Sequence, residues 1–533
     1  MRANSPSATG TPPRRSQRQG RWTTVIVLAG ITISSAWLIQ QPGWAASSHF
    51  ALVRSLANGT PHIDKYQQET GDKGWWEGHY HSNKAPGLAA LSLPAYLALQ
   101  RVPPIARDRD RMVWALNLWS VVLPALALFL LARYVGDVLT DGFGTVGAGA
   151  LAVASLVTPF STMFFSHVTA ATMGLAAFAL LLRERNAPPS LAAVAGGGLL
   201  AGLAVVFEYP MGLVVVWLFA YAIARDGMPS RALAFAGGAV AGLVPLLVYD
   251  VWLFGSPFHL SYAEVIVRSG SSGHDLVADN GAGFFGVALP SLTGMMQLLG
   301  DDRGLLTLAP VAAAGAAGLA LLYRNGRRAE ALTCGGIAFS TLLYNAGYNP
   351  PFGGVFGGNS PGPRFLLTAL PFVFVALGLA YRRAPIAVAS LLAVSAVTMT
   401  VATATGPRLG SNETGRWWTM LRQGNFVDTL ATEAGAADGW LSIAPYFLAI
   451  AAALAVIGLD TPQRRPFSRE IAAAAGVAGA WAVVAVLVPR ALANESPSIP
   501  ATIVAGLVLA GSIALCVGIV HSTSDPDSGG SSS

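Results

Sequence analysis

The sequence predicts an all-α polytopic membrane protein with about fourteen transmembrane helices. Hydrophobic residues make up 53% of its 533 residues and charged residues only 11%, whereas a soluble globular protein has roughly 25% charged residues. The mean hydropathy is +0.53. Apolar runs of about 20 residues, the length that crosses a bilayer, alternate with short loops that carry arginine. These observations exclude a soluble enzyme, a fibrous protein and a disordered chain.

The predicted spans follow one another along almost the whole chain. They cover residues 23–40, 111–132, 144–160, 167–182, 191–207, 210–224, 232–253, 304–322, 330–346, 364–381, 385–403, 440–458, 470–488 and 499–520. The short arginine-rich loops, such as 324–328 and 382–383, fall on one side, which the positive-inside rule identifies as the cytoplasm together with the N-terminus. The alternative is a cleaved secretory signal ending near Gly43–Ser47, which would remove the first span.

The spans divide the chain into successive regions. These are a cytoplasmic tail 1–22, a membrane domain 23–403 that includes a large outer loop 41–110, a second outer loop 404–439, C-terminal spans within 440–520 and a disordered tail 521–533. The apolar stretch 87–100 is too short to cross the bilayer comfortably, so we expect a re-entrant or half-buried helix there.

The net positive charge of the chain does not indicate nucleic-acid binding. Its net charge is +6, but the arginines are scattered through short loops instead of forming one basic stripe. The two cysteines, Cys334 and Cys516, both lie in apolar runs, so no cysteine-based metal site or disulfide framework is expected. The partner that the composition does predict is the lipid bilayer.

The outer segment 47–88 carries most of the candidate chemistry. Residues 48–57 have the apolar spacing of a short amphipathic helix at the membrane surface. Acidic residues follow this helix, and a carboxylate can act as the general base on a hydroxyl group. Adjacent tryptophans can stack on sugar rings, or they can mark the interfacial belt of the membrane. The candidates of this segment are the acids Asp64, Glu69, Asp72 and Glu77 and the aromatic residues Trp75 and Trp76.

Lys84 stands directly before the apolar stretch 87–100. A cation at the start of a helix suits a phosphate group, because the free backbone N–H groups also favour an anion. The alternative is a lysine that snorkels at the membrane interface. Next to it, His79-Tyr80-His81 puts two histidines on one face of an extended strand, and no third metal ligand is evident.

Ionisable residues also occur at the predicted outer ends of several spans. Such residues are functional candidates, because a charge near the membrane is costly, although each of them could instead cap or orient a helix. They are His167, Glu208, Asp250, Arg303 and Arg364.

Several motifs of the chain resemble the GT-C class of membrane glycosyltransferases. The likeness is to the family 39-like group, which includes protein O-mannosyltransferases and lipid A aminoarabinose transferases, and to actinobacterial-type glycosyltransferase-like membrane proteins. The motifs that carry it are Gly-His-Tyr-His-Ser-Asn-Lys-Ala-Pro-Gly (78–87), Thr-Pro-Phe-Ser-Thr-Met-Phe-Phe-Ser-His (158–167), Phe-Glu-Tyr-Pro (207–210), Phe-Gly-Ser-Pro-Phe (254–258), Asp-Arg-Gly-Leu-Leu (302–306) and Gly-Pro-Arg-Phe-Leu (362–366).

The resemblance implies a polyprenyl-phosphate-sugar donor, inversion at the anomeric carbon and a catalytic acid in the large outer loop. Lys84 matches the lysine of the family's Lys-Pro-Pro motif, which meets the lipid phosphate and here reads Lys84-Ala85-Pro86. The chain departs from the family after the first span, where the usual acid is replaced by Ala45-Ala46-Ser47-Ser48-His49. Asp72 or Asp64 would have to substitute for that acid.

The expected function is therefore transfer of a sugar from polyprenyl phosphate to a cell-envelope glycan, lipid or protein, at the outer face of a bacterial plasma membrane. Asp72 or Asp64 would deprotonate the acceptor, and Lys84 with Arg303 or Arg364 would stabilise the phosphate leaving group. The predicted substrate contacts also include Trp75, Trp76, His79, Tyr80, His81, His167 and Glu208. No metal site is assigned, and a divalent cation is left open as a cofactor.

Two other functions fit parts of the pattern. A non-catalytic protein that binds polyprenyl phosphate or glycan would keep the fold and lack the base. A transporter or flippase is disfavoured, because the sequence has no repeated halves and no pair of broken central spans.

Overall fold

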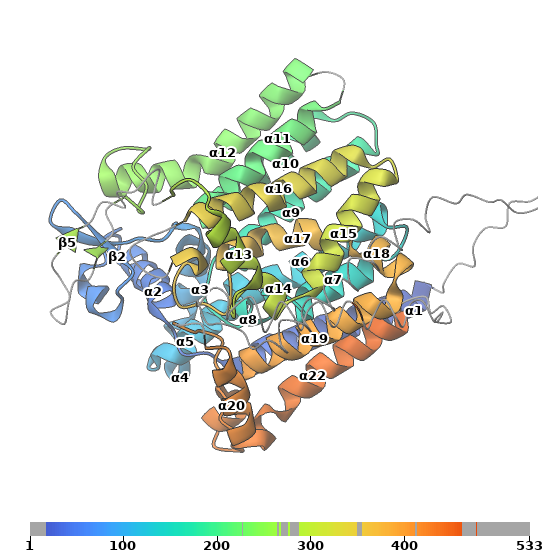
Figure 1. Ribbon diagram of the computed structural model, residues 1–533. Coiled ribbons are helices and arrows are strands. Elements are labelled where there is room, and N and C mark those ends of the chain that lie inside the picture. The colour runs from blue at the N-terminus through green and yellow to red at the C-terminus, as the bar shows by residue number, and fades with distance from the viewer. Residues whose placement is uncertain are drawn as a thin grey trace, which may run out of the picture.

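The computed structural model describes residues 17–225, 228–263, 266–267, 276–277, 287–348, 354–410 and 413–460, together with residue 476. In this part of the chain the fold is almost entirely helical (Figure 1). The predicted spans 470–488 and 499–520 and the predicted tail 521–533 lie outside the described residues.

The α-helices run from the N-terminal region to residue 460. They are α1 (Gln17–Trp37), α2 (Trp44–Ala57), α3 (Gly87–Leu99), α4 (Pro103–Ala106), α5 (Arg109–Asn117), α6 (Leu123–Leu139), α7 (Gly144–Val153), α8 (Val157–Phe160), α9 (His167–Arg185), α10 (Leu191–Phe207), α11 (Gly212–Ile223), α12 (Met228–Phe254), α13 (Leu292–Gly300), α14 (Leu305–Leu308), α15 (Val311–Arg324), α16 (Arg328–Gly347), α17 (Leu370–Phe374), α18 (Leu377–Arg383), α19 (Pro385–Ala404), α20 (Gly415–Gln423), α21 (Leu430–Glu433) and α22 (Gly439–Asp460).

Short elements connect these helices. The helical turns are η1 (Asp64–Glu69), η2 (Leu118–Val122), η3 (Tyr209–Met211), η4 (Gly354–Phe356) and η5 (Arg364–Ala369). Three antiparallel strand pairs occur among the described residues: β1 (Leu38–Ile39) with β6 (Asp428–Thr429), β2 (Lys73–Trp76) with β3 (His79–Ser82), and β4 (Ile266–Val267) with β5 (Leu276–Val277).

Four of the described helices are long and apolar enough to cross a membrane. They are Arg109–Leu139, Met228–Phe254, Pro385–Ala404 and Gly439–Gly458. Two bent pairs raise this number to six: Leu292–Leu308 with Val311–Arg324, bent by 94°, and Arg364–Phe374 with Leu377–Arg383, bent by 59°. The described structure therefore fits a membrane protein, but it does not confirm the larger number of spans that hydropathy predicts.

Part of the difference arises because some predicted spans form apolar helices of only 10–17 residues, such as Leu191–Phe207. The rest includes places where the backbone breaks an apolar run. The predicted span 144–160 is divided at Ala154–Leu156 into α7 and α8. Pro310 lies in the short break between α14 and α15. The 94° bend therefore falls inside the predicted span 304–322. Proline lacks the N–H donor that a continuous helix needs. A hydropathy window sums over such breaks and cannot detect them.

Glycines allow the central helices to approach each other closely. A Cβ atom at Gly198 or Gly202 of α10 would lie 2.1 or 2.2 Å from a backbone carbonyl oxygen of α12. Gly238 and Gly242 of α12 face α10 in the same way, at 2.0 and 2.3 Å. Each helix therefore presents two glycines four residues apart, the small-residue spacing that lets membrane helices pack backbone to backbone.

The segment 41–110 folds into short elements beside the helix bundle, where α2, α3 and the β2–β3 hairpin gather (Figure 1). The amphipathic helix predicted over 48–57 corresponds to α2, which begins earlier, at Trp44. Residues Ala45 to Val53 of α2 are buried, so this helix packs inside the protein more than the prediction of a surface helix implies. The helix predicted over 87–100 is confirmed as α3.

The start of α3 is pressed against the end of α10. A Cβ atom added at Gly87 would lie 2.6 Å from the carbonyl oxygen of Val206 and 2.9 Å from the ring of Phe207. Only glycine permits this approach, which brings the Lys84 segment beside Glu208. The position of Gly87 is thus a packing requirement of the site described below.

We expect Gly87→Ala to lower the unfolding temperature of the purified protein, because overpacking a buried contact costs about 1–3 kcal/mol. Gly237→Ala is the matched control, since a Cβ atom there meets nothing within 4 Å on the exposed side of α12. Alanine in an exposed helix is more favourable than glycine by about 0.5–1 kcal/mol. Equal unfolding temperatures for the two variants would contradict the close approach of α3 and α10.

Candidate functional site

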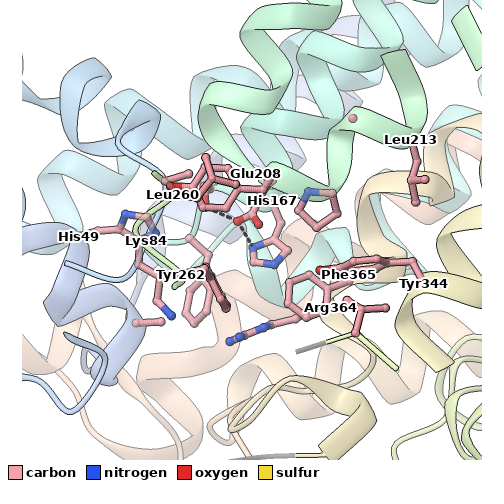
Figure 2. Close-up of a pocket in the computed structure, with 18 residues that line it drawn as sticks. His49, Lys84, His167, Glu208, Leu213, Leu260, Tyr262, Tyr344, Arg364 and Phe365 are labelled. Carbon is pink, nitrogen blue, oxygen red and sulfur yellow. Dashed lines mark hydrogen bonds and ion pairs between the residues drawn. The ribbon is translucent and has the colours of Figure 1, made fainter. Parts of the chain in front are cut away.

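A cavity of about 370 Å³ lies where the segment 41–110 meets the ends of the helices. Its size is that of a small-molecule pocket. The lining comes from α2, the residues just before α3, the N-terminus of α9, the residue after α10, η3, the start of α11, α16, η5 and the loops beside them. Figure 2 shows these side chains around the cavity. It consists of Ala45, His49, Lys84, Ala85, Phe165, Ser166, His167, Glu208, Tyr209, Pro210, Gly212, Leu213, Leu260, Tyr262, Val287, Tyr344, Arg364 and Phe365. Most of these residues are apolar or aromatic, and the charged residues among them are few.

Lys84 supplies one cation to the cavity. Its backbone N–H donates to the hydroxyl of Ser82, which lies 2.7 Å from the hydroxyl of Ser48, so α2 holds the segment in place. The ammonium of Lys84 forms an ion pair with Asp72 at 3.0 Å. Burial alone would raise the pKa of Asp72, but the charges of Lys84 and Arg364 hold that pKa below its ordinary value. Asp72 is therefore ionised at neutral pH.

Arg364 supplies the second cation, at the first residue of η5. Its side chain is buried and lies over the ring of Phe365, with the guanidinium carbon 5.1 Å from the ring centroid. Within the described ranges, no carboxylate pairs with this guanidinium, and its Nε atom has no hydrogen-bond partner. Asp72 and Glu208 act on this guanidinium only from beyond ion-pair distance. A buried charge without a close partner is costly, so an anionic ligand beside Arg364 would be stabilised.

Glu208 lies between α10 and η3 on the same cavity. The hydroxyl of Ser166 donates a hydrogen bond to its Oε1 atom, and the Nδ1 atom of His167 lies 3.2 Å from that same oxygen (Figure 2). Burial raises the pKa of Glu208, although the Ser166 hydrogen bond and the charges of Arg364 and Lys84 act in the opposite direction. The cavity therefore has a carboxylate of raised proton affinity as well as two cations.

His49 is a cavity residue that the sequence analysis did not include among the candidates. It lies on α2, is 2% exposed, and its Nδ1 atom has no hydrogen-bond partner in the described structure. Burial and the charge of Lys84 lower the pKa of His49 to about 3, so its imidazole is neutral at physiological pH. Tyr262 and Tyr344 were missed in the same way. The signal for His49 was its position just after the first span, where the resemblance draws attention to a missing acid.

The sequence candidates on the β2–β3 hairpin do not reach the cavity lining. The turn between the strands is made by Glu77 and Gly78, both with positive φ, 47° and 90°, as a two-residue hairpin turn requires. Asp64 accepts a hydrogen bond from the backbone N–H of Tyr80 at 2.6 Å and lies 2.8 Å from the Nδ1 atom of His79. Asp64 is therefore engaged in holding η1 to this hairpin.

The remaining hairpin candidates make aromatic contacts. The ring of Trp75 packs edge-on against Tyr80 at 4.6 Å, and the ring of Trp76 lies 4.4 Å from that of His259. His81 is buried, and its Nε2 atom lies 3.4 Å from the carbonyl oxygen of Ser261. The contacts of Trp76 and His81 join the hairpin to the segment after α12.

Arg303 is also separated from the cavity lining. Its guanidinium donates to the carbonyl oxygens of Leu409 at 2.7 Å and of Gly358 and Ser360 at 3.3 Å, and it lies over the ring of Phe356. This arginine therefore joins three loops at the same end of the bundle.

Asp250, the other span-end candidate, is fully buried in α12, and neither carboxylate oxygen has a hydrogen-bond partner among the described residues. It is not part of the cavity lining.

Within the described ranges, no three or more His, Cys, Asp or Glu residues lie together so that they could hold a metal ion. His79 and His81 alternate along β3, as the sequence predicts, but their contacts are with Asp64 and with the carbonyl of Ser261. The described structure thus offers no preformed ligand set for a divalent cation.

No protein-family model matches the sequence, and no curated protein matches it. Two solved structures with a similar chain path are those of ArnT from Cupriavidus metallidurans. The apo form aligns over 94% of this chain and 78% of its own, with 14% identity and a TM-score of 0.46. The form bound to undecaprenyl phosphate covers 95% and 78%, with 14% identity and a TM-score of 0.45.

A third similar structure is the archaeal oligosaccharyltransferase AglB from Archaeoglobus fulgidus, in complex with an inhibitory peptide and a dolichol-phosphate. It aligns over 90% of this chain and 61% of its own, with 11% identity and a TM-score of 0.43. At 14% and 11% identity, these likenesses concern the path of the chain.

Proposed function

We propose that the chain is a membrane glycosyltransferase that moves a sugar from polyprenyl phosphate to a cell-envelope acceptor at the outer face of the bacterial plasma membrane. The observation that carries this proposal is the pair of cations, Lys84 and Arg364, on one largely apolar cavity. A phosphate group would give Arg364 a close anionic partner, because no carboxylate of the described residues forms an ion pair with its guanidinium and its Nε atom has no hydrogen-bond partner. The apolar lining suits a ligand that joins an anionic head to a hydrocarbon chain.

The two cations would act most strongly during bond cleavage. As the bond between the anomeric carbon and the phosphate oxygen breaks, negative charge grows on the leaving phosphate, and cations fixed in a site of low dielectric constant stabilise it. Attack by the acceptor oxygen from the opposite face would invert the anomeric carbon. Because Lys84 is paired with Asp72, a phosphate that binds this ammonium would release Asp72.

The geometry supports Asp72 over Asp64 among the two carboxylates that the sequence predicts as the base. Asp72 lies beside Lys84, whereas Asp64 is engaged with His79 and Tyr80. A protein that binds polyprenyl phosphate without transferring a sugar is the second candidate, because Asp72 is neutralised by Lys84 and the first turns of α2 carry no acid.

The lipids of a deletion strain test the proposed function. If the protein consumes a polyprenyl-phosphate sugar, this donor should accumulate when the gene is deleted and fall to its normal level when the wild-type protein is restored. Mass spectrometry of extracted lipids would identify the sugar. An unchanged set of polyprenyl-phosphate sugars, with the protein present and folded in the control strain, would contradict transfer and leave binding as the function.

A further inference from the structure

The general base, which takes the proton from the hydroxyl of the acceptor substrate, must meet three conditions of position and charge. It must line the cavity, it must have an oxygen or nitrogen free to face the acceptor, and it must not be neutralised by a fixed cation. Asp72 fails the first and third conditions, because it is not part of the cavity lining and it pairs with Lys84 at 3.0 Å.

Glu208 satisfies all three conditions. It lines the cavity, and its side chain is 13% exposed. Ser166 and His167 both approach Oε1, which leaves Oε2 without a hydrogen bond from any described residue. No lysine or arginine of the described chain lies within ion-pair distance of this carboxylate, whose one close basic neighbour is His167. The hydrogen bond from Ser166 orients the group, and the ring of His167 lies beside the same oxygen without a hydrogen bond to it.

We propose that Glu208 is the residue that takes the proton from the acceptor hydroxyl, with Ser166 and His167 as positioning residues. This inference rests on the proposed function. The acceptor O–H bond breaks and its proton moves to Oε2 of Glu208. The acceptor oxygen then forms its bond to the anomeric carbon, and the bond from that carbon to the phosphate oxygen breaks. The electron pair stays on the phosphate, which Lys84 and Arg364 hold, and Glu208 later returns the proton to water.

The charges around Glu208 support this role. Burial raises the pKa of Glu208, and Lys84 and Arg364 oppose that rise in the ligand-free protein. A bound phosphate neutralises both cations, so the proton affinity of Glu208 increases when the donor is present. The group thus becomes a stronger base in the complex in which it is needed. Asp72 could take the proton only after its ion pair with Lys84 is broken.

The test compares Glu208→Gln with Asp72→Asn in the full-length protein reconstituted in lipid vesicles. The donor is the polyprenyl-phosphate sugar fraction from the deletion strain, and binding is measured with undecaprenyl phosphate. Glu208→Gln should lower the transfer rate by roughly a hundredfold to ten-thousandfold, the usual cost of losing a general base, and should leave lipid binding intact. Glu77→Gln, on the exposed hairpin turn, is the control and should leave the rate unchanged.

A second readout separates a base from a structural residue. Transfer should fall as the pH decreases through the pKa of Glu208, which lies above the ordinary value of 4.5. Ser166→Ala removes a hydrogen bond that favours the carboxylate, so it should move this acidic limb to higher pH. A purely structural serine would change the rate without moving the limb.

The results distinguish failure of the proposed glycosyl transfer from failure of Glu208 as its general base. Wild-type transfer with an active Glu208→Gln and an inactive Asp72→Asn would overturn the assignment of Glu208 and leave the proposed function standing. A wild-type protein that binds undecaprenyl phosphate but transfers no sugar would overturn the proposed function and the assignment with it. Loss of transfer in Glu208→Gln together with loss of lipid binding would also contradict a role as base.

Discussion

Arg364→Met should weaken the binding of polyprenyl phosphate and at the same time raise the unfolding temperature of the ligand-free protein. The guanidinium is buried and has no carboxylate partner among the described residues. A methionine of similar length removes a charge whose burial costs several kcal/mol and that no carboxylate of the described residues approaches within ion-pair distance. Loss of one charge-assisted contact to the phosphate should cost about 1.5–3 kcal/mol, or roughly tenfold to a hundredfold in affinity.

The opposite signs of the two effects make this prediction specific. Binding is measured with undecaprenyl phosphate, and stability by thermal unfolding of the purified protein in detergent. Arg101→Met is the control, because Arg101 is exposed after α3 and should change neither quantity. A destabilised Arg364→Met variant with normal lipid affinity would mean that Arg364 supports the fold and does not bind the phosphate.

Lys84→Ala should lower donor use by roughly tenfold to a hundredfold, for the same loss of a charge-assisted contact. The effect should lie near the upper end of this range, because the substitution also leaves Asp72 as an unpaired anion close to the phosphate. Donor use is measured as kcat/KM for the polyprenyl-phosphate sugar. Lys65→Ala is the matched control, since Lys65 lies on the exposed turn η1 outside the cavity lining. Small and equal effects of both changes would mean that Lys84 only snorkels at the interface.

Several residues of the cavity could be selected from the sequence because charge is rare in this chain. Lys84, His167, Glu208 and Arg364 were singled out as ionisable groups beside apolar runs, and the structure brings all four to one cavity. Their separations in sequence gave no information on which of them would meet. That outcome depends on close packing, such as the contact of Gly87 with the end of α10.

Other predictions needed information that sequence patterns lack. Arg303 and Arg364 have similar local sequences, yet Arg303 is surrounded by loop carbonyl groups and Arg364 faces the cavity. His49 was noticed only as a position without an acid, since hydropathy cannot tell which side of α2 is buried against the bundle. The number of spans differed from hydropathy because some apolar runs continue through helix breaks and bends, others form helices of only 10–17 residues, and two predicted spans lie outside the described residues.

The most direct test of the central claim is to follow the donor itself. The purified protein is reconstituted in vesicles with the polyprenyl-phosphate sugar fraction and an envelope extract as acceptor, with and without a chelator for divalent cations. We predict that the wild-type protein releases free polyprenyl phosphate in step with glycosylation of the acceptor, and that the double variant Lys84→Ala, Arg364→Met releases none above background. Release at the wild-type rate by the double variant would contradict the account, because the phosphate would then not be bound by these two cations.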